Sequence, residues 1–242
     1  MNELSDSGGT AEPVKAYLES VFISTAAGLI DVYRRSSEPA EAGLIFPKYR
    51  KDGSFRACEQ EARILLVHRL LSDARYRVSV ETPTGELYRF SGKGMRSGQV
   101  DTTIFAVGHE VTAHIEFKSD NRDRRGIQKD LEKLIRERRM GGWFHTLGAA
   151  DRGTLPTLAN KFKDAMVALR AHVSESQACD SLFAFCAIRN QVLVLRWHQL
   201  GSSDSLAAFD DLSLESTSWK VLSLKRAERR RANNVGPPRP VV

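Results

Sequence analysis

Residues 111–121 constrain the fold more than any other part of the chain. Their apolar and polar side chains alternate strictly, which is the pattern of a β-strand with two different faces. One face carries Val111, Ala113, Ile115 and Phe117, and the other carries Thr112, His114, Glu116 and Lys118. Glu116 and Lys118 are therefore neighbours on the polar face. A solvated face of an antiparallel sheet is one explanation of this pattern.

A second strand predicted upstream favours another explanation. Asp101 lies in residues 99–105, on the face opposite to the apolar residues of that segment. The residues between the two strands include Gly108, which favours a hairpin turn. Antiparallel pairing would bring Asp101 toward Glu116 and Lys118. Two carboxylates that converge beside a lysine form a site suited to a magnesium ion.

This arrangement resembles a known catalytic signature. Asp101 followed by Glu116-Phe117-Lys118 is similar to the signature of the PD-(D/E)xK nuclease superfamily, which has the restriction-endonuclease-like fold. Val100 stands where the signature has proline, a departure that is common in the superfamily. The resemblance covers about residues 55–147. It implies a mixed α/β (α+β) domain in which helices flank a mixed central sheet, and it implies cleavage of phosphodiester bonds.

The resemblance also implies a role for each residue of the signature. Asp101 and Glu116 would hold Mg²⁺, with Mn²⁺ as a substitute, and the Phe117 backbone carbonyl would be a further ligand. Lys118 would orient the attacking water and stabilise the negative charge that develops at phosphorus. His114 shares the strand face but lies farther along, where a structural hydrogen bond is the expected role.

An acidic residue on a preceding helix often lies beside the metal in this superfamily. The predicted helix over residues 56–71 carries Glu59 and Glu61. We choose Glu61 as a catalytic residue and metal ligand because it is nearer the apolar stripe, where a carboxylate needs a partner or a cation. Glu59 is the alternative, and both could also be ordinary solvent-facing residues.

Basic residues surround the signature in the sequence. An amphipathic helix is predicted within residues 121–139, and a glycine-rich segment, residues 92–98, leads into the Asp101 strand. The candidate nucleic-acid contacts are Lys93, Arg96, Arg122, Arg124, Arg125, Gln128 and Lys129. Each of the charged residues is also explained as ordinary solvated surface. A net charge of +6 and a pI near 9.3 favour an acidic partner, above all nucleic acid.

The chain is expected to form one domain over residues 14–224. Residues 1–13 and the basic tail, residues 225–242, are expected to be disordered. The other predicted elements are a helix over residues 14–33, a hairpin over residues 76–90 turned at 82–85, a strand over residues 143–147, a helix from Thr154 to about His172, a hairpin over residues 182–197 and a last strand over residues 219–224.

The composition favours a soluble, cytoplasmic protein. The apolar runs are much shorter than the roughly 20 residues that a membrane span requires, and the first residues have no signal-peptide pattern. The three cysteines are Cys58, Cys179 and Cys186, without a CxxC pair. Their number and spacing favour buried reduced thiols over a disulfide framework or a zinc cluster.

Together these features predict a magnesium-dependent endonuclease whose substrate is DNA, with restriction or phage defence as the biological setting. A homodimer would allow two symmetric sites to cut both strands, and a protein partner could activate the enzyme. The alternative is a catalytically silent nuclease-like scaffold that binds nucleic acid or protein. The intact signature argues against this alternative, because clustered carboxylates repel each other when no cation is bound.

Overall fold

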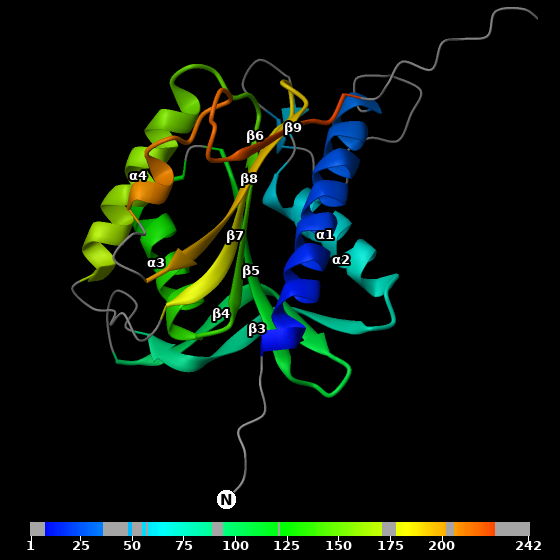
Figure 1. Ribbon diagram of the computed structural model, residues 1–242, viewed down its shortest axis with the longest axis vertical. Helices are drawn as coiled ribbons and strands as arrows, with labels where there is room; N and C mark the ends of the chain where they lie inside the picture. The colour runs from blue at the N-terminus through cyan, green and yellow to red at the C-terminus, as the bar shows by residue number, and fades with distance from the viewer. Residues whose placement is uncertain are drawn as a thin grey trace, which may run out of the picture.

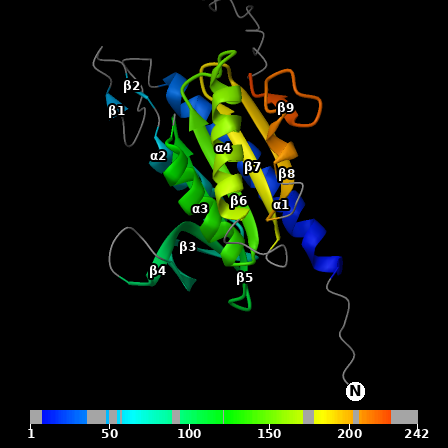
Figure 2. The same ribbon diagram turned by 90° about the vertical axis from the view of Figure 1, so that its left-hand side faces the viewer.

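The computed structural model describes residues 8–35, 48–49, 55–56, 58–88, 94–120, 122–170, 178–201 and 206–225. In this part of the chain, four helices pack against a seven-stranded mixed sheet, which confirms the predicted mixed α/β class. The helices are α1 (Gly8–Arg35), α2 (Glu59–Leu71), α3 (Arg124–Arg136) and α4 (Thr154–Arg170). Helices α1 and α2 cover one face of the sheet, and α3 and α4 cover the other (Figures 1 and 2).

The order of strands in the sheet follows their order in the chain. The strands are β3 (Tyr76–Tyr88), β4 (Arg96–Ala106), β5 (Val111–Ser119), β6 (Met140–Leu147), β7 (Cys179–Ala187), β8 (Val192–Leu200) and β9 (Lys220–Ser223). Strands β5, β6 and β7 run parallel, and the other neighbours pair antiparallel. Short strands β1 (Lys48–Tyr49) and β2 (Phe55–Arg56) pair separately, and η3 (Ala207–Phe209) is a 3₁₀ turn.

Each face of the sheet builds its own hydrophobic core. In β7, Phe183 and Phe185 pack under α3 and α4, whereas Leu182 and Ala184 pack under α1 and α2. Strand β7 is thus apolar on both faces, as is typical of a strand covered by helices on both sides. The layer arrangement places the odd-numbered apolar side chains of β5 toward α1 and α2, so its even-numbered polar side chains lie on the α3 side.

The predicted β4–β5 hairpin is confirmed. Thr102 pairs with Ile115 and Thr103 pairs with His114, and this antiparallel register sets Asp101 opposite Glu116. The hairpin formed by β7 and β8 and the last strand β9 are also confirmed. The strand predicted over residues 143–147 is part of β6.

The hairpin predicted over residues 76–90 is wrong. Strand β3 runs through the predicted turn and pairs with β4 on both sides of it, with a register shift between Pro83 and Leu87. The carboxylate of Glu137, just after α3, accepts hydrogen bonds from the Gly85 and Glu86 amides at 3.0 and 3.1 Å. This contact satisfies the backbone of the irregular segment from outside the sheet, so the Pro and Gly residues form a bulge and not a turn.

The N-terminal helix begins at Gly8, inside the segment that was expected to be disordered. Residues 1–7 and 226–242, and with them most of the basic tail, lie outside the described residues, as does Lys93.

No helix in the described part of the chain has both the length and the apolar character needed to cross a membrane. The three cysteines are buried, and none of them forms a disulfide bond.

Gly142 in β6 provides a test of how closely α1 packs on the sheet. A Cβ atom added at Gly142 would lie 2.9 Å from Phe22 Cζ and 3.0 Å from Ile115 Cγ1. We expect Gly142→Ala to lower the free energy of unfolding by about 1–3 kcal/mol, because an overpacked core must shift. Gly108→Ala, where nothing lies within 4 Å of the added atom, is the matched control. Equal denaturation midpoints for the two variants would contradict this packing.

Candidate active site

The predicted polar face of β5 is buried rather than solvated. Glu116 is 0% exposed and Lys118 is 6% exposed. Pairing with β4 and β6 covers the edges of β5, and α3 lies over this face. Buried charges need charged or hydrogen-bonding partners, so these two residues must form part of an internal ionic cluster.

Asp101, Glu116 and Lys118 come together as the sequence predicted. Lys118 Nζ lies 3.6 Å from Asp101 Oδ2 and 3.5 Å from Glu116 Oε2. The same ammonium donates a hydrogen bond to the Phe117 carbonyl at 2.7 Å, and the Phe117 amide donates to Asp101 Oδ2 at 2.8 Å. Lys118 Nζ therefore lies among three of the four groups that were proposed as metal ligands.

Helix α3 adds Asp130 and Lys133, neither of which sequence reasoning selected. Asp130 contacts both ammonium groups, with Oδ2 2.8 Å from Lys118 Nζ and Oδ1 2.8 Å from Lys133 Nζ. Lys133 Nζ also lies 2.5 Å from Glu116 Oε1. The cluster thus contains three carboxylates and two ammonium groups. The sequence contained a signal that Asp130 is buried, because this residue lies between Ile127 and the later apolar residues of the helix stripe.

The electrostatics of the cluster centre on Glu116. Burial, together with the carboxylates of Asp130 and Asp101, raises the pKa of Glu116 well above its usual range. Burial alone would lower the pKa of Lys118, but the neighbouring carboxylates of Asp130, Glu116 and Asp101 raise it above its usual value. Both Glu116 oxygens are buried without a hydrogen bond of normal geometry, although lysine nitrogens approach them. The ammonium groups of Lys133 and Lys118 therefore compensate the charge of Glu116.

The cluster opens into a cavity of about 830 Å³ between α3 and the β3–β4 strands. The predicted residues that line it are Glu59, Arg96, Asp101, Glu116, Lys118, Arg122 and Lys129. Asp130 and Lys133 line the same cavity. The rim is mixed in charge, with the basic side chains of Arg96, Arg122 and Lys129 and the carboxylates of Glu59 and Glu81. The three exposed basic side chains would attract a polyanion.

Other predicted site residues do not line this cavity. Glu59, and not Glu61, faces it, while Glu61 is 1% exposed and packs on the inner side of α2. The helical period explains the difference, because residues two apart point in different directions. In α3 the cavity-facing positions are 126, 129, 130 and 133, so Gln128 is turned away. Arg124 and Arg125 are exposed but also lie outside the lining.

His114 has a structural contact, as predicted. Its Nδ1 forms a hydrogen bond with Thr103 Oγ1 at 3.0 Å, and Nε2 lies 4.0 Å from Glu137 Oε2. Glu137 also accepts a hydrogen bond from Tyr88 Oη at 3.0 Å. These contacts connect β3, β4, β5 and the end of α3 on the side of the sheet that holds the site.

His145 in β6 supports the turn that follows β5. Its Nε2 lies 2.6 Å from the Asp120 carbonyl, which also accepts a hydrogen bond from the Arg122 amide at 3.0 Å. Trp143 Nε1 donates to His145 Nδ1 at 3.4 Å. The buried ring therefore donates from one nitrogen and accepts at the other, which requires its neutral form. The His145 ring thereby holds the backbone turn that places Arg122 in the lining of the cavity.

This burial predicts a dependence of stability on pH. Burial lowers the pKa of His145 from 6.5 to about 4, so the unfolded chain binds more protons than the folded protein between these values. The contribution of the neutral His145 ring to the free energy of unfolding is fully present above pH 6.5 and is lost as the pH falls toward 4. It amounts to about 3 kcal/mol. Chemical denaturation across this range should show a flatter profile for His145→Gln, and an unchanged profile would contradict the assignment.

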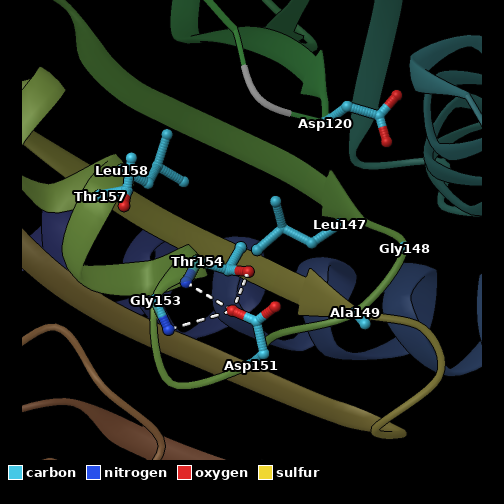
Figure 3. A pocket seen from close by; sticks show the side chains of 9 residues that line it. All are labelled: Asp120, Leu147, Gly148, Ala149, Asp151, Gly153, Thr154, Thr157 and Leu158. Carbon is cyan, nitrogen blue, oxygen red and sulfur yellow. Dashed lines mark hydrogen bonds between the residues drawn. The ribbon is translucent and has the colours of Figure 1, made fainter.

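A second cavity, of about 370 Å³, lies where β5 and β6 end and α4 begins (Figure 3). The Asp151 carboxylate accepts hydrogen bonds from the Gly153 amide at 3.0 Å and from the Thr154 amide at 2.8 Å. The amide groups that could attract an anion to this helix start are thus already paired with a carboxylate. This cavity is separate from the lining of the candidate site.

The oxygen atoms at the site can be compared with the ligands that Mg²⁺, the metal implied by the resemblance, requires. Within the described ranges, no three His, Cys, Asp or Glu side chains form a group that could hold a metal ion. Mg²⁺ is commonly bound through only one or two carboxylates, with water completing its shell. Asp101, Glu116 and the Phe117 carbonyl provide such an oxygen set, in which the Glu116 oxygens have ion-pair contacts with two lysines but no hydrogen bond of normal geometry. The donor set therefore fits Mg²⁺.

Comparison of the chain with protein-family models, with curated proteins and with solved structures found no match in any of the three.

Proposed function

We propose that this protein is a metal-dependent nuclease with a restriction-endonuclease-like core. The observation that supports this most is the convergence of Asp101, Glu116 and Lys118 in one cavity, which Arg96, Arg122 and Lys129 also line. Hydrolysis of a phosphodiester needs an oriented water and compensation of negative charge on the phosphate, and this group of residues can supply both. DNA is the proposed substrate, and Mg²⁺, or Mn²⁺ in its place, is the proposed cofactor.

Each residue has a distinct task in this mechanism. Asp101 and Glu116 would hold the metal ion, which when bound supplies a polarised water and a counter-charge for the phosphate. Lys118, held by Asp130 and the Phe117 carbonyl, would donate a hydrogen bond to the attacking water or to a phosphate oxygen. Arg96, Arg122 and Lys129 at the rim would bind neighbouring phosphates of the polymer. These last contacts should weaken as the salt concentration rises.

We further propose restriction or phage defence in the cytoplasm as the setting, with a homodimer or an activating protein as candidate partners. The burial of all three cysteines as thiols outside any disulfide supports a reducing compartment.

A non-cutting scaffold is the second candidate. Lys118 and Lys133 already contact the carboxylates of the cluster, and ion pairs could hold this arrangement without a metal. In that case the basic side chains of the rim would bind nucleic acid and no bond would be cleaved.

Cleavage of labelled duplex DNA, single-stranded DNA and RNA, with Mg²⁺, Mn²⁺ or EDTA, distinguishes the two candidates. We expect cleavage with Mg²⁺ or Mn²⁺ that EDTA and Asp101→Ala both abolish. Binding of nucleic acid without cleavage, together with no binding of Mn²⁺ by calorimetry, would favour the scaffold. Bound Mn²⁺ without cleavage would direct the search to an activating partner.

A further inference from the structure

Lys133 on α3 is the second buried ammonium group of the cluster. Its Nζ lies 2.5 Å from Glu116 Oε1, 2.8 Å from Asp130 Oδ1 and 2.8 Å from the Gln99 carbonyl. An ammonium group has three protons, and these are three acceptors. The residue is 4% exposed, so its charge is balanced by the protein and not by water. The PD-(D/E)xK signature gives Lys133 no role.

The charges of the cluster cancel only if one of its three carboxylates is protonated. Asp101, Glu116 and Asp130 contribute three negative charges when ionised, while Lys118 and Lys133 contribute two positive charges. The surplus of negative charge attracts a cation. A divalent cation on Glu116 would have to share that carboxylate with Lys133 and would be repelled by the nearby ammonium.

We infer that Lys133 is a positioning residue that holds the Glu116 carboxylate and competes with the divalent cation for it. Lys133 thereby sets the affinity of the site for the metal. Asp130 and the Gln99 carbonyl give Lys133 two contacts that do not depend on Glu116. The Lys133 ammonium would therefore keep its position when Glu116 binds a cation. This inference rests on the proposed function only in assuming that the site binds Mg²⁺ or Mn²⁺.

Binding of Mn²⁺ in the absence of nucleic acid tests the inference, by electron paramagnetic resonance or calorimetry. Lys133→Gln removes one positive charge and keeps an amide that can donate to Glu116. We expect it to bind Mn²⁺ at least about tenfold more tightly than the wild type. Asp130→Asn removes a negative charge that is not a metal ligand, and we expect it to bind Mn²⁺ more weakly. A general folding defect would weaken binding in both variants, so the opposite signs are diagnostic.

Lys163→Gln and Asp164→Asn make the same charge changes on α4, outside the cavity lining, and serve as controls that should bind as the wild type does. The inference is overturned if Lys133→Gln binds Mn²⁺ no more tightly than the wild type, while wild-type binding is still lost in Asp101→Ala. Absence of Mn²⁺ binding in the wild type and in every variant would overturn the metal-dependent function as well. The two failures are therefore distinguishable.

Discussion

Lys118→Met is expected to lower the rate of DNA cleavage by about 10³-fold, a loss typical of removing one preorganised donor from a transition-state site. The wild-type ammonium lies 3.6 Å from Asp101 and 3.5 Å from Glu116, where a phosphate would approach the proposed metal ligands. Methionine keeps the length of the side chain and removes its charge. The measurement is a single-turnover cleavage rate with saturating Mg²⁺.

The controls separate chemistry from folding. Lys163→Met removes a partly exposed lysine of α4 that pairs with Asp210, and its cleavage rate should equal that of the wild type. Lys118→Arg keeps the charge, but we expect it to remain impaired because a guanidinium does not fit the position between the Phe117 carbonyl and Asp130. If Lys118→Met folds normally and cleaves at the wild-type rate, Lys118 has no catalytic role.

Phe162→Ala should cause a large loss of stability. The Phe162 ring on α4 is fully buried, with its centroid 4.8 Å from that of Phe209 and 5.0 Å from that of Trp143. Removing it leaves a cavity between α4 and the sheet, and we expect the free energy of unfolding to fall by about 3–5 kcal/mol. Val167→Ala on the same helix, at a side chain that is 57% exposed, should change it by less than about 0.5 kcal/mol. Urea denaturation compares the two variants, and similar midpoints would show that α4 does not pack as described.

Local patterns predicted much of the fold and part of the site. The alternation of polar and apolar residues around Glu116, with a turn at Gly108, was enough to predict that Asp101 would lie near Glu116 and Lys118. The alternation and the turn are both local features of the sequence, and the turn of a hairpin fixes the register of its two strands. The same reasoning failed for β3, where a distant carboxylate, that of Glu137, stabilises a bulge in place of the expected turn.

The part of the site that comes from α3 required tertiary information. Alternation places Glu116 on a polar face, but it does not say that a helix covers that face. Lys133 contacts Glu116, and Asp130 contacts Lys118 and Lys133, only because α3 crosses over β5. The choice between Glu59 and Glu61 failed for a similar reason, since a buried carboxylate can face either the core of the domain or its cavity.

The sequential order of the strands has a consequence for how the protein is made. Each strand from β4 to β9 pairs with the strand that precedes it in the chain, so no strand has to enter between two that are already paired. Contacts between elements near in sequence lower the entropy lost in loop closure and favour rapid folding. During synthesis the sheet can grow from β3 outward, one strand at a time. The strands and the helix that carry Asp101, Glu116 and Lys133 emerge from the ribosome before β7. The ionic cluster can therefore assemble while the second half of the sheet is still being translated.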